Sequence, residues 1–144
     1  MPGYFKNEAA TAETIFGDWL HTGDIGYYDQ NGHVFYVDRK KELIKVKGFQ
    51  VAPAELEDLL RRLSGVKDVA VIGVPDERAG EVPRAYVVRA AESLSEEEVK
   101  NHVAANLSVY KHLAGGVELL PEIPKSAAGK ILRKNLKASF LEKQ

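Results

Sequence analysis

Apolar residues in the middle of the chain recur with the period of an α-helix. Four leucines follow Pro53 at positions that share one helical face: Leu56, Leu59, Leu60 and Leu63. Proline fits the first turn of a helix because the backbone N–H that it lacks would have no partner there. The pattern therefore predicts an amphipathic helix that begins at Pro53.

Two β-branched runs follow, at residues 69–74 and 82–89, and a polar loop separates them. Strands joined by a short loop usually pair antiparallel, so these runs predict neighbouring strands of one sheet. A third run, at residues 117–120, predicts a further strand. Before it, Ser95 and Glu98 stand at the spacing of a capping box, which predicts the start of another helix.

The last apolar pattern closes the predicted domain, since Leu132, Leu136 and Phe140 indicate a final helix. The order of elements indicates the α+β class, with a small three-stranded, largely antiparallel sheet flanked by helices. A β-hairpin is expected to precede this sheet at residues 26–38. There, aromatic and β-branched runs flank an Asn-Gly turn at residues 31–32.

Composition narrows the class of protein. The chain has 144 residues, of which 44% are hydrophobic and 28% are charged, as in ordinary globular domains. A formal net charge of -1 gives no broad attraction to nucleic acid, so no nucleic-acid partner is expected. Cysteine is absent, which excludes disulfides and thiolate chemistry. The histidines show no metal-ligand spacing, so no metal site is expected either.

The sequence shows none of three common targeting patterns. No apolar run reaches the length of a transmembrane helix. The N-terminal residues lack the charged and then apolar pattern of a signal peptide, and the last residues are not a peroxisomal signal. We therefore expect the cytoplasm or an organelle lumen as the location.

The most informative polar pattern is a basic cluster within an apolar segment. It ends at Gly48, and glycine lets a ligand approach the backbone closely, so the cluster suggests a surface that meets phosphate. For Lys45 and Lys47, a solvated strand face is an equal alternative on local grounds. The cluster comprises Arg39, Lys40, Lys41, Lys45 and Lys47.

Two further residues could contact a nucleotide. Lys130 lies on a loop rich in Ser, Ala and Gly, but Pro124 and Ile131 break the P-loop pattern. By composition alone, a plain surface loop is favoured there. Asp24 precedes the predicted hairpin, and it fits either a turn or an acceptor for ribose hydroxyls.

Taken together, these segments resemble the adenylate-forming superfamily, which includes acyl-CoA synthetases, 4-coumarate–CoA ligases and beetle luciferases. The matching segments read GDWLHTGDIGYYDQNGHVFYVDRKKELIKVKGFQVAPAELE at residues 17–57, GVPDERAGEVPRAYVV at 73–88 and EIPKSAAGKILRKNL at 122–136. Their order and spacing hold across nearly the whole chain. The run KGFQVAPAELE is most similar to the coumarate-ligase and luciferase branch.

The resemblance implies roles for four residues in nucleotide binding and adenylation. Asp24 and Arg39 match residues that contact the ribose of ATP or AMP. Lys41 matches the hinge at which a small C-terminal domain rotates against a large one. Lys130 matches the lysine that holds the α-phosphate and carboxylate oxygens during adenylation.

It also implies a second reactive face. Lys45 matches the lysine that enters the active site for the second half-reaction, which is thioester formation in ligases and oxidation in luciferases. Lys47, Gly48 and Gln50 match positions along the path of CoA. Lys40 departs from the family pattern, which usually has an apolar residue there.

The implied domain organisation assigns residues 1–38 to the tail of the large N-terminal adenylation region. Residues 39–41 are expected to form the hinge and residues 42–144 the mobile lid domain. The Ser/Thr/Gly-rich ATP loop of the large region has no counterpart in this sequence. That N-terminal adenylation domain is the first partner that the resemblance implies.

The function implied is that of the lid portion of an AMP-forming acid–CoA ligase. Such an enzyme uses a small-molecule carboxylic acid, CoA, and ATP supplied with Mg²⁺. The chain by itself is expected to be inactive and to hold no tightly bound cofactor. A luciferase-like lid and a non-catalytic binding or complementation module are the alternatives. In the latter, the hairpin at residues 26–38 could support self-association.

Overall fold

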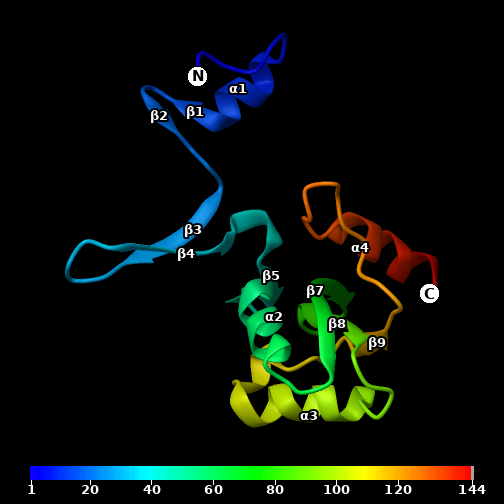
Figure 1. Cartoon of the computed structure of the whole chain (residues 1–144). Helices are drawn as coiled ribbons and strands as arrows, with labels where there is room; N and C mark the ends of the chain where they lie inside the picture. Colours follow the sequence, from blue (N-terminus) through cyan, green and yellow to red (C-terminus); the bar gives the residue numbers. More distant parts are fainter. Residues whose placement is uncertain (144) are drawn as a thin grey trace. The chain divides into compact units, whose positions relative to one another are not determined.

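A computed structural model describes residues 1–143. The chain divides into two compact units, residues 1–41 and the segment from residue 42 onward (Figure 1). No helix in residues 1–143 has the length and apolar character needed to cross a membrane.

The first unit consists of one short helix and two small antiparallel pairs of strands. Within residues 1–41 only Asp38 is buried, so this unit has no hydrophobic core of its own. Its elements are α1 (Glu8–Thr14), β1 (Ile15–Phe16), β2 (Trp19–Leu20), β3 (Asp24–Tyr28) and β4 (Val34–Arg39). The sequence pattern did not predict α1, which is capped by the Asn7 side chain.

Strands β3 and β4 form the hairpin that the sequence predicted, with slightly wider bounds. The Asp29 carboxylate accepts the backbone N–H of Asn31 at 2.8 Å and of His33 at 2.9 Å. Gly32 has φ +82°, a conformation that glycine adopts without strain. The turn is thus built by side-chain and backbone features that lie within the loop itself.

The second unit holds a five-stranded sheet. The hydrogen-bonded order is β6-β5-β8-β7, and β9 pairs with β8 in parallel while the other pairs are antiparallel. Strand β8 is central because β7 lies along one edge and β5 and β9 share the other. The strands are β5 (Ile44–Val46), β6 (Phe49–Val51), β7 (Val66–Asp76), β8 (Gly80–Arg89) and β9 (Val117–Leu119).

The sequence prediction of a three-stranded sheet was therefore wrong, although the α+β class and the mostly antiparallel pairing are confirmed. The prediction placed Lys45 on a short strand but did not include that strand, β5, in the sheet, and it missed β6, with which β5 forms a hairpin at the sheet edge. Each has only three residues, too few for alternation to be distinguished from chance. Their pairing depends on the tight turn between them rather than on a long apolar run.

Three helices complete the second unit: α2 (Pro53–Arg61), α3 (Glu96–Asn106) and α4 (Arg133–Glu142). Two 3₁₀ turns also occur, η1 (Lys40–Glu42) before β5 and η2 (Val109–Lys111) after α3. Both α2 and α4 pack on β7, and α3 packs against α2 and β9. Pro53 opens α2, and Ser95 and Glu98 form the predicted capping box of α3.

One hydrophobic core joins these elements. The fully buried side chains include Leu56 and Leu60 of α2, Val71 of β7 and Val87 of β8. Full burial of one such side chain contributes about 1.5–3 kcal/mol to the free energy of unfolding. The core makes the second unit a rigid base for the loops on its surface.

Candidate functional site

Lys45 lies on the exposed face of the β5–β6 hairpin. Its neighbours Ile44 and Val46 are buried, so the alternation of the strand directs Lys45 to the opposite face, toward solvent. The hairpin turns at Lys47 and Gly48, which have φ +49° and +85°. Two consecutive positive φ values fit a type I′ turn, the usual connection for such a tight hairpin.

The backbone on both sides of Lys45 is fixed by β8 and the loop before it. The Lys45 N–H donates to the Glu81 carboxylate at 3.1 Å. The Lys47 N–H donates to the Ala79 carbonyl at 2.8 Å, and Val46 pairs with Gly80. The position of Lys45 is therefore set by several bonds, while Lys47, Gly48 and Gln50 are exposed next to it.

An aromatic pair lies beside this turn, and sequence reasoning did not identify it. The rings of Phe49 and Tyr110 stack with centroids 4.6 Å apart. Phe49 is 55% exposed, so one face of the pair is open to solvent. The residues lie 61 positions apart in sequence, 110 minus 49, and no local pattern connects them.

Lys130 lies on a closed loop before α4. The Leu132 N–H donates to the Pro124 carbonyl at 2.9 Å, and the Ser126 N–H donates to the Lys130 carbonyl at 2.8 Å. Gly129 has φ +78°, which allows the chain to reverse just before Lys130. Lys130 itself is exposed, and its loop has a defined shape.

The two residues predicted to contact ribose lie opposite each other in the first unit. Asp24 of β3 pairs in register with Arg39 of β4, and their side chains form an ion pair with Oδ1 and Nε 2.9 Å apart. Arg39 also donates to the Thr22 carbonyl at 3.4 Å. Lys41, the predicted hinge residue, is exposed in η1.

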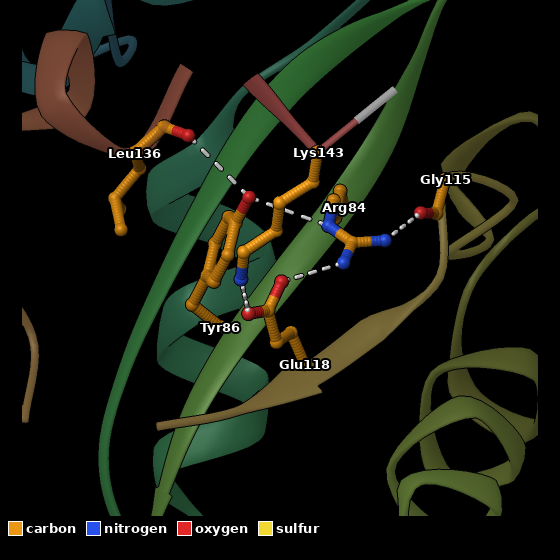
Figure 2. Close-up of polar contacts among 6 residues, drawn as sticks. All are labelled: Arg84, Tyr86, Gly115, Glu118, Leu136 and Lys143. Atoms are coloured by element: carbon orange, nitrogen blue, oxygen red, sulfur yellow. Dashed lines mark hydrogen bonds and ion pairs between the residues drawn. The ribbon is translucent and has the colours of Figure 1, made fainter. Parts of the chain in front are cut away.

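A cluster of polar contacts, which the sequence did not predict, joins the five-stranded sheet to α4 (Figure 2). Arg84 donates to Glu118 at 2.7 Å and to the Gly115 carbonyl at 2.7 Å. Lys143 at the end of α4 also pairs with Glu118. The Tyr86 hydroxyl donates to the Leu136 carbonyl at 3.5 Å. The residues come from β8, from β9 and the loop before it, and from α4 and its C-terminal end, so only the folded chain brings them together.

Electrostatics in this group stabilise the charged forms. The hydrogen bond from Lys143 lowers the pKa of Glu118 below its ordinary value of 4.5, and Arg84 acts in the same direction, while burial opposes both. For Arg84, burial works to lower the pKa, but the Glu118 and Tyr86 contacts outweigh it and raise the pKa. The group is thus a stable ion network that holds α4 on the sheet.

The chain matches the model of a known protein family. The model of the AMP-binding enzyme C-terminal domain matches residues 55–130, more than half of the chain. The chain belongs to this family. The matched range ends at Lys130 and includes η2 and the Arg84–Glu118 pair.

Two relatives are similar to this chain along nearly its whole length. A probable 4-coumarate–CoA ligase of Dictyostelium discoideum is 54% identical over 139 residues, or 95% of this chain and 25% of that protein. A luciferin 4-monooxygenase of Photuris pensylvanica is 50% identical over 142 residues, which are 97% of this chain and 26% of that protein.

The fold is similar as well. The o-succinylbenzoate CoA synthetase of Bacillus subtilis, solved with an acyl-adenylate intermediate, matches with a TM-score of 0.86 and 35% identity. That match covers 95% of this chain and 28% of the synthetase. The chain therefore spans about a quarter of the length of the relatives it matches.

Proposed function

We propose that the chain is the C-terminal lid portion of an acyl-activating ligase. The full enzyme would form an acyl-adenylate from a carboxylic acid and ATP, and then an acyl-CoA thioester. The observation that carries the proposal is the 54% identity to a probable 4-coumarate–CoA ligase across 95% of the chain. The exposed positions of Lys45 and Lys130 in the second unit support it.

In the first half-reaction, a substrate carboxylate oxygen attacks the α-phosphorus of ATP and pyrophosphate leaves. Negative charge gathers on the carboxylate and phosphate oxygens as the new bond forms. The Lys130 ammonium would stabilise that charge, because lysine provides a compact point charge. Asp24 would accept hydrogen bonds from the ribose hydroxyls, and Arg39 would hold Asp24 in place through their 2.9 Å ion pair.

In the second half-reaction, the CoA sulfur attacks the acyl carbonyl, the thiol proton is lost, and AMP leaves. Lys45 would face this reaction, since β5 holds it on the exposed side of the hairpin. Lys47, Gly48 and Gln50 would line the path of CoA. Glycine at the turn keeps that path free of a side chain, and nothing lies within 4 Å of where its Cβ would be.

The proposed domain organisation follows from these roles. Residues 1–38 would complete the large adenylation region, residues 39–41 would form the hinge with Lys41 as its pivot, and residues 42–144 would form the lid. Rotation of a lid against the large region can exchange one reactive group for another within a single pocket. Mg²⁺ would arrive with ATP as Mg-ATP.

Thioester formation is proposed over luciferase-type oxidation as the second step. The identity to the coumarate-ligase relative is 54%, against 50% for the luciferin monooxygenase. The two chemistries differ in their readout, since one consumes CoA and the other emits light with a luciferin.

A graft tests the proposal. The Dictyostelium relative would keep about its first three-quarters, and this chain would replace the matching last quarter. We expect CoA thioester formation from ATP and coumarate, while the chain alone forms none because the substrate pockets lie in the missing region. The same graft with Lys130→Ala is the control, and its adenylation should fall roughly a hundred- to a thousandfold. A soluble graft without thioester formation, beside an active parent enzyme, would contradict the proposal.

A further inference from the structure

Arg133 forms a junction beside the Lys130 loop. It is the first residue of α4, and its side chain is only 14% exposed. Its Nη2 lies 2.9 Å from Oε1 of Glu57 in α2, and its Nε lies 3.6 Å from Oε2 of Glu42. One guanidinium thus contacts carboxylates from two other segments of the second unit.

The contact with Glu57 is the stronger one. The Glu57 side chain is 5% exposed, and the same Oε1 accepts the Val71 N–H of β7 at 2.9 Å. Arg61 also approaches Glu57, but at 3.8 Å and with 48% of its side chain exposed. A buried carboxylate is costly without a close cation, so Arg133 has a fixed place over α2 and β7.

The junction connects the segments of both candidate lysines. Lys130 stands three residues before Arg133, and Lys45 stands three residues after Glu42. Glu42 is also the first residue of the second unit, where the chain leaves the proposed hinge. The Arg133–Glu42 contact therefore joins the residues just after the Lys130 loop to the residues just before the strand of Lys45.

The two segments differ in how much they depend on this junction. Lys45 lies on a strand that β6 and β8 hold by backbone bonds. The Lys130 loop has its own internal hydrogen bonds. Outside itself it is tied by the Lys125 ion pair with Asp68 at 2.5 Å, by packing of Ile131 on the core, and by Arg133 where α4 begins, whose pair with Glu57 is the most buried ion pair among these ties. Loss of Arg133 should therefore release Lys130 and leave Lys45 in place.

We propose that Arg133 is a positioning residue that fixes the Lys130 loop for adenylation. It acts through Glu57, and it need not touch the substrate. This inference rests on the proposed function, because Lys130 is assigned to adenylation there. It goes beyond that function by naming the buried Arg133–Glu57 contact that keeps Lys130 in position.

The first test compares half-reactions in the grafted enzyme. Arg133→Met should lower the rate of acyl-adenylate formation by roughly a hundredfold, the size of effect that a displacement of about 1 Å can cause. Thioester formation from supplied acyl-adenylate should stay within about twofold of wild type, since Lys45 is held separately. Arg133→Lys should recover part of the loss, because a lysine can still neutralise Glu57 but cannot bridge both carboxylates.

The matched control is Arg62→Met, which removes an arginine from an exposed ion pair with Asp58. Both half-reactions should be unchanged in that variant, because exposed ion pairs contribute little. Equal losses in both half-reactions for Arg133→Met would show a purely structural role and overturn the inference. So would full adenylation activity in that variant.

Hydrogen exchange in the 144-residue chain separates this inference from the proposed function. In Arg133→Met, the amides of Ser126, Gly129 and Leu132 should exchange at least about tenfold faster, while amides paired between β7 and β8 lose clearly less of their protection. Unchanged loop amides, or a parallel loss in loop and sheet, would overturn the inference. A graft without any adenylation would contradict the proposed function alone, since the exchange result still decides whether Arg133 anchors the loop.

Discussion

At the scale of single residues, the structure separates charges that stabilise the fold from charges that are available for chemistry. Glu57, Arg84 and Glu118 are largely buried and hydrogen-bonded. Lys45 and Lys130 are exposed on backbone segments whose shapes are well defined. Ordered backbone beneath an exposed ammonium is what a charge-stabilising group requires, because the charge is then in position before the reaction begins.

The Glu118 network gives a prediction about acid stability. The pKa of Glu118 is lowered in the folded chain, so its stabilising effect is complete above about pH 4.5 and is lost as the pH falls through its folded pKa. Glu118→Gln should lower the free energy of unfolding at pH 7 by about 1–3 kcal/mol, the value of hydrogen bonds to charged groups. Urea unfolding at pH 7 and at acidic pH measures this.

The difference between wild type and Glu118→Gln should shrink as the pH is lowered below 4.5. Asp58→Asn serves as the control, because the Asp58 side chain is 62% exposed in its pair with Arg62. Its effect at pH 7 should be at most about 1 kcal/mol. A constant difference between wild type and Glu118→Gln at every pH would contradict the assigned role of the carboxylate.

At the scale of secondary-structure elements, local signals predicted what local bonds build. The α3 capping box and the β3–β4 turn could both be predicted from the sequence, because each involves residues four or fewer positions apart. The strand β6 and the place of β5 in the sheet were not predicted, since three residues carry little periodicity. The Arg84–Glu118 and Arg133–Glu57 pairs were also missed, because residues 34 and 76 positions apart meet only in the folded chain.

The α3 cap provides a direct test at this scale. The Ser95 side chain accepts the Glu98 N–H, and the Glu98 carboxylate accepts the Ser95 N–H. Ser95→Ala should lower the free energy of unfolding by about 1 kcal/mol. Ser108→Ala is the matched control, because Ser108 precedes η2 without any side-chain cap bond. Equal effects of the two substitutions in chemical denaturation would contradict the capping account.

At the scale of the whole molecule, the two units differ in what stabilises them. The hydrophobic core lies in the second unit, and residues 1–41 bury only Asp38. The sequence resemblance correctly indicated the family, but it did not indicate the acyl substrate. The residues predicted to contact ribose lie in the first unit, and the two candidate lysines lie in the second.

The central claim is that Lys130 and Lys45 serve different half-reactions. The most direct measurement is the rate of each half-reaction in the grafted enzyme carrying Lys130→Ala or Lys45→Ala. Lys130→Ala should lose roughly a hundred- to a thousandfold in acyl-adenylate formation and keep thioester formation from supplied acyl-adenylate, and Lys45→Ala should show the reverse. If both variants lost only adenylation, the assignment of the two lysines would be wrong.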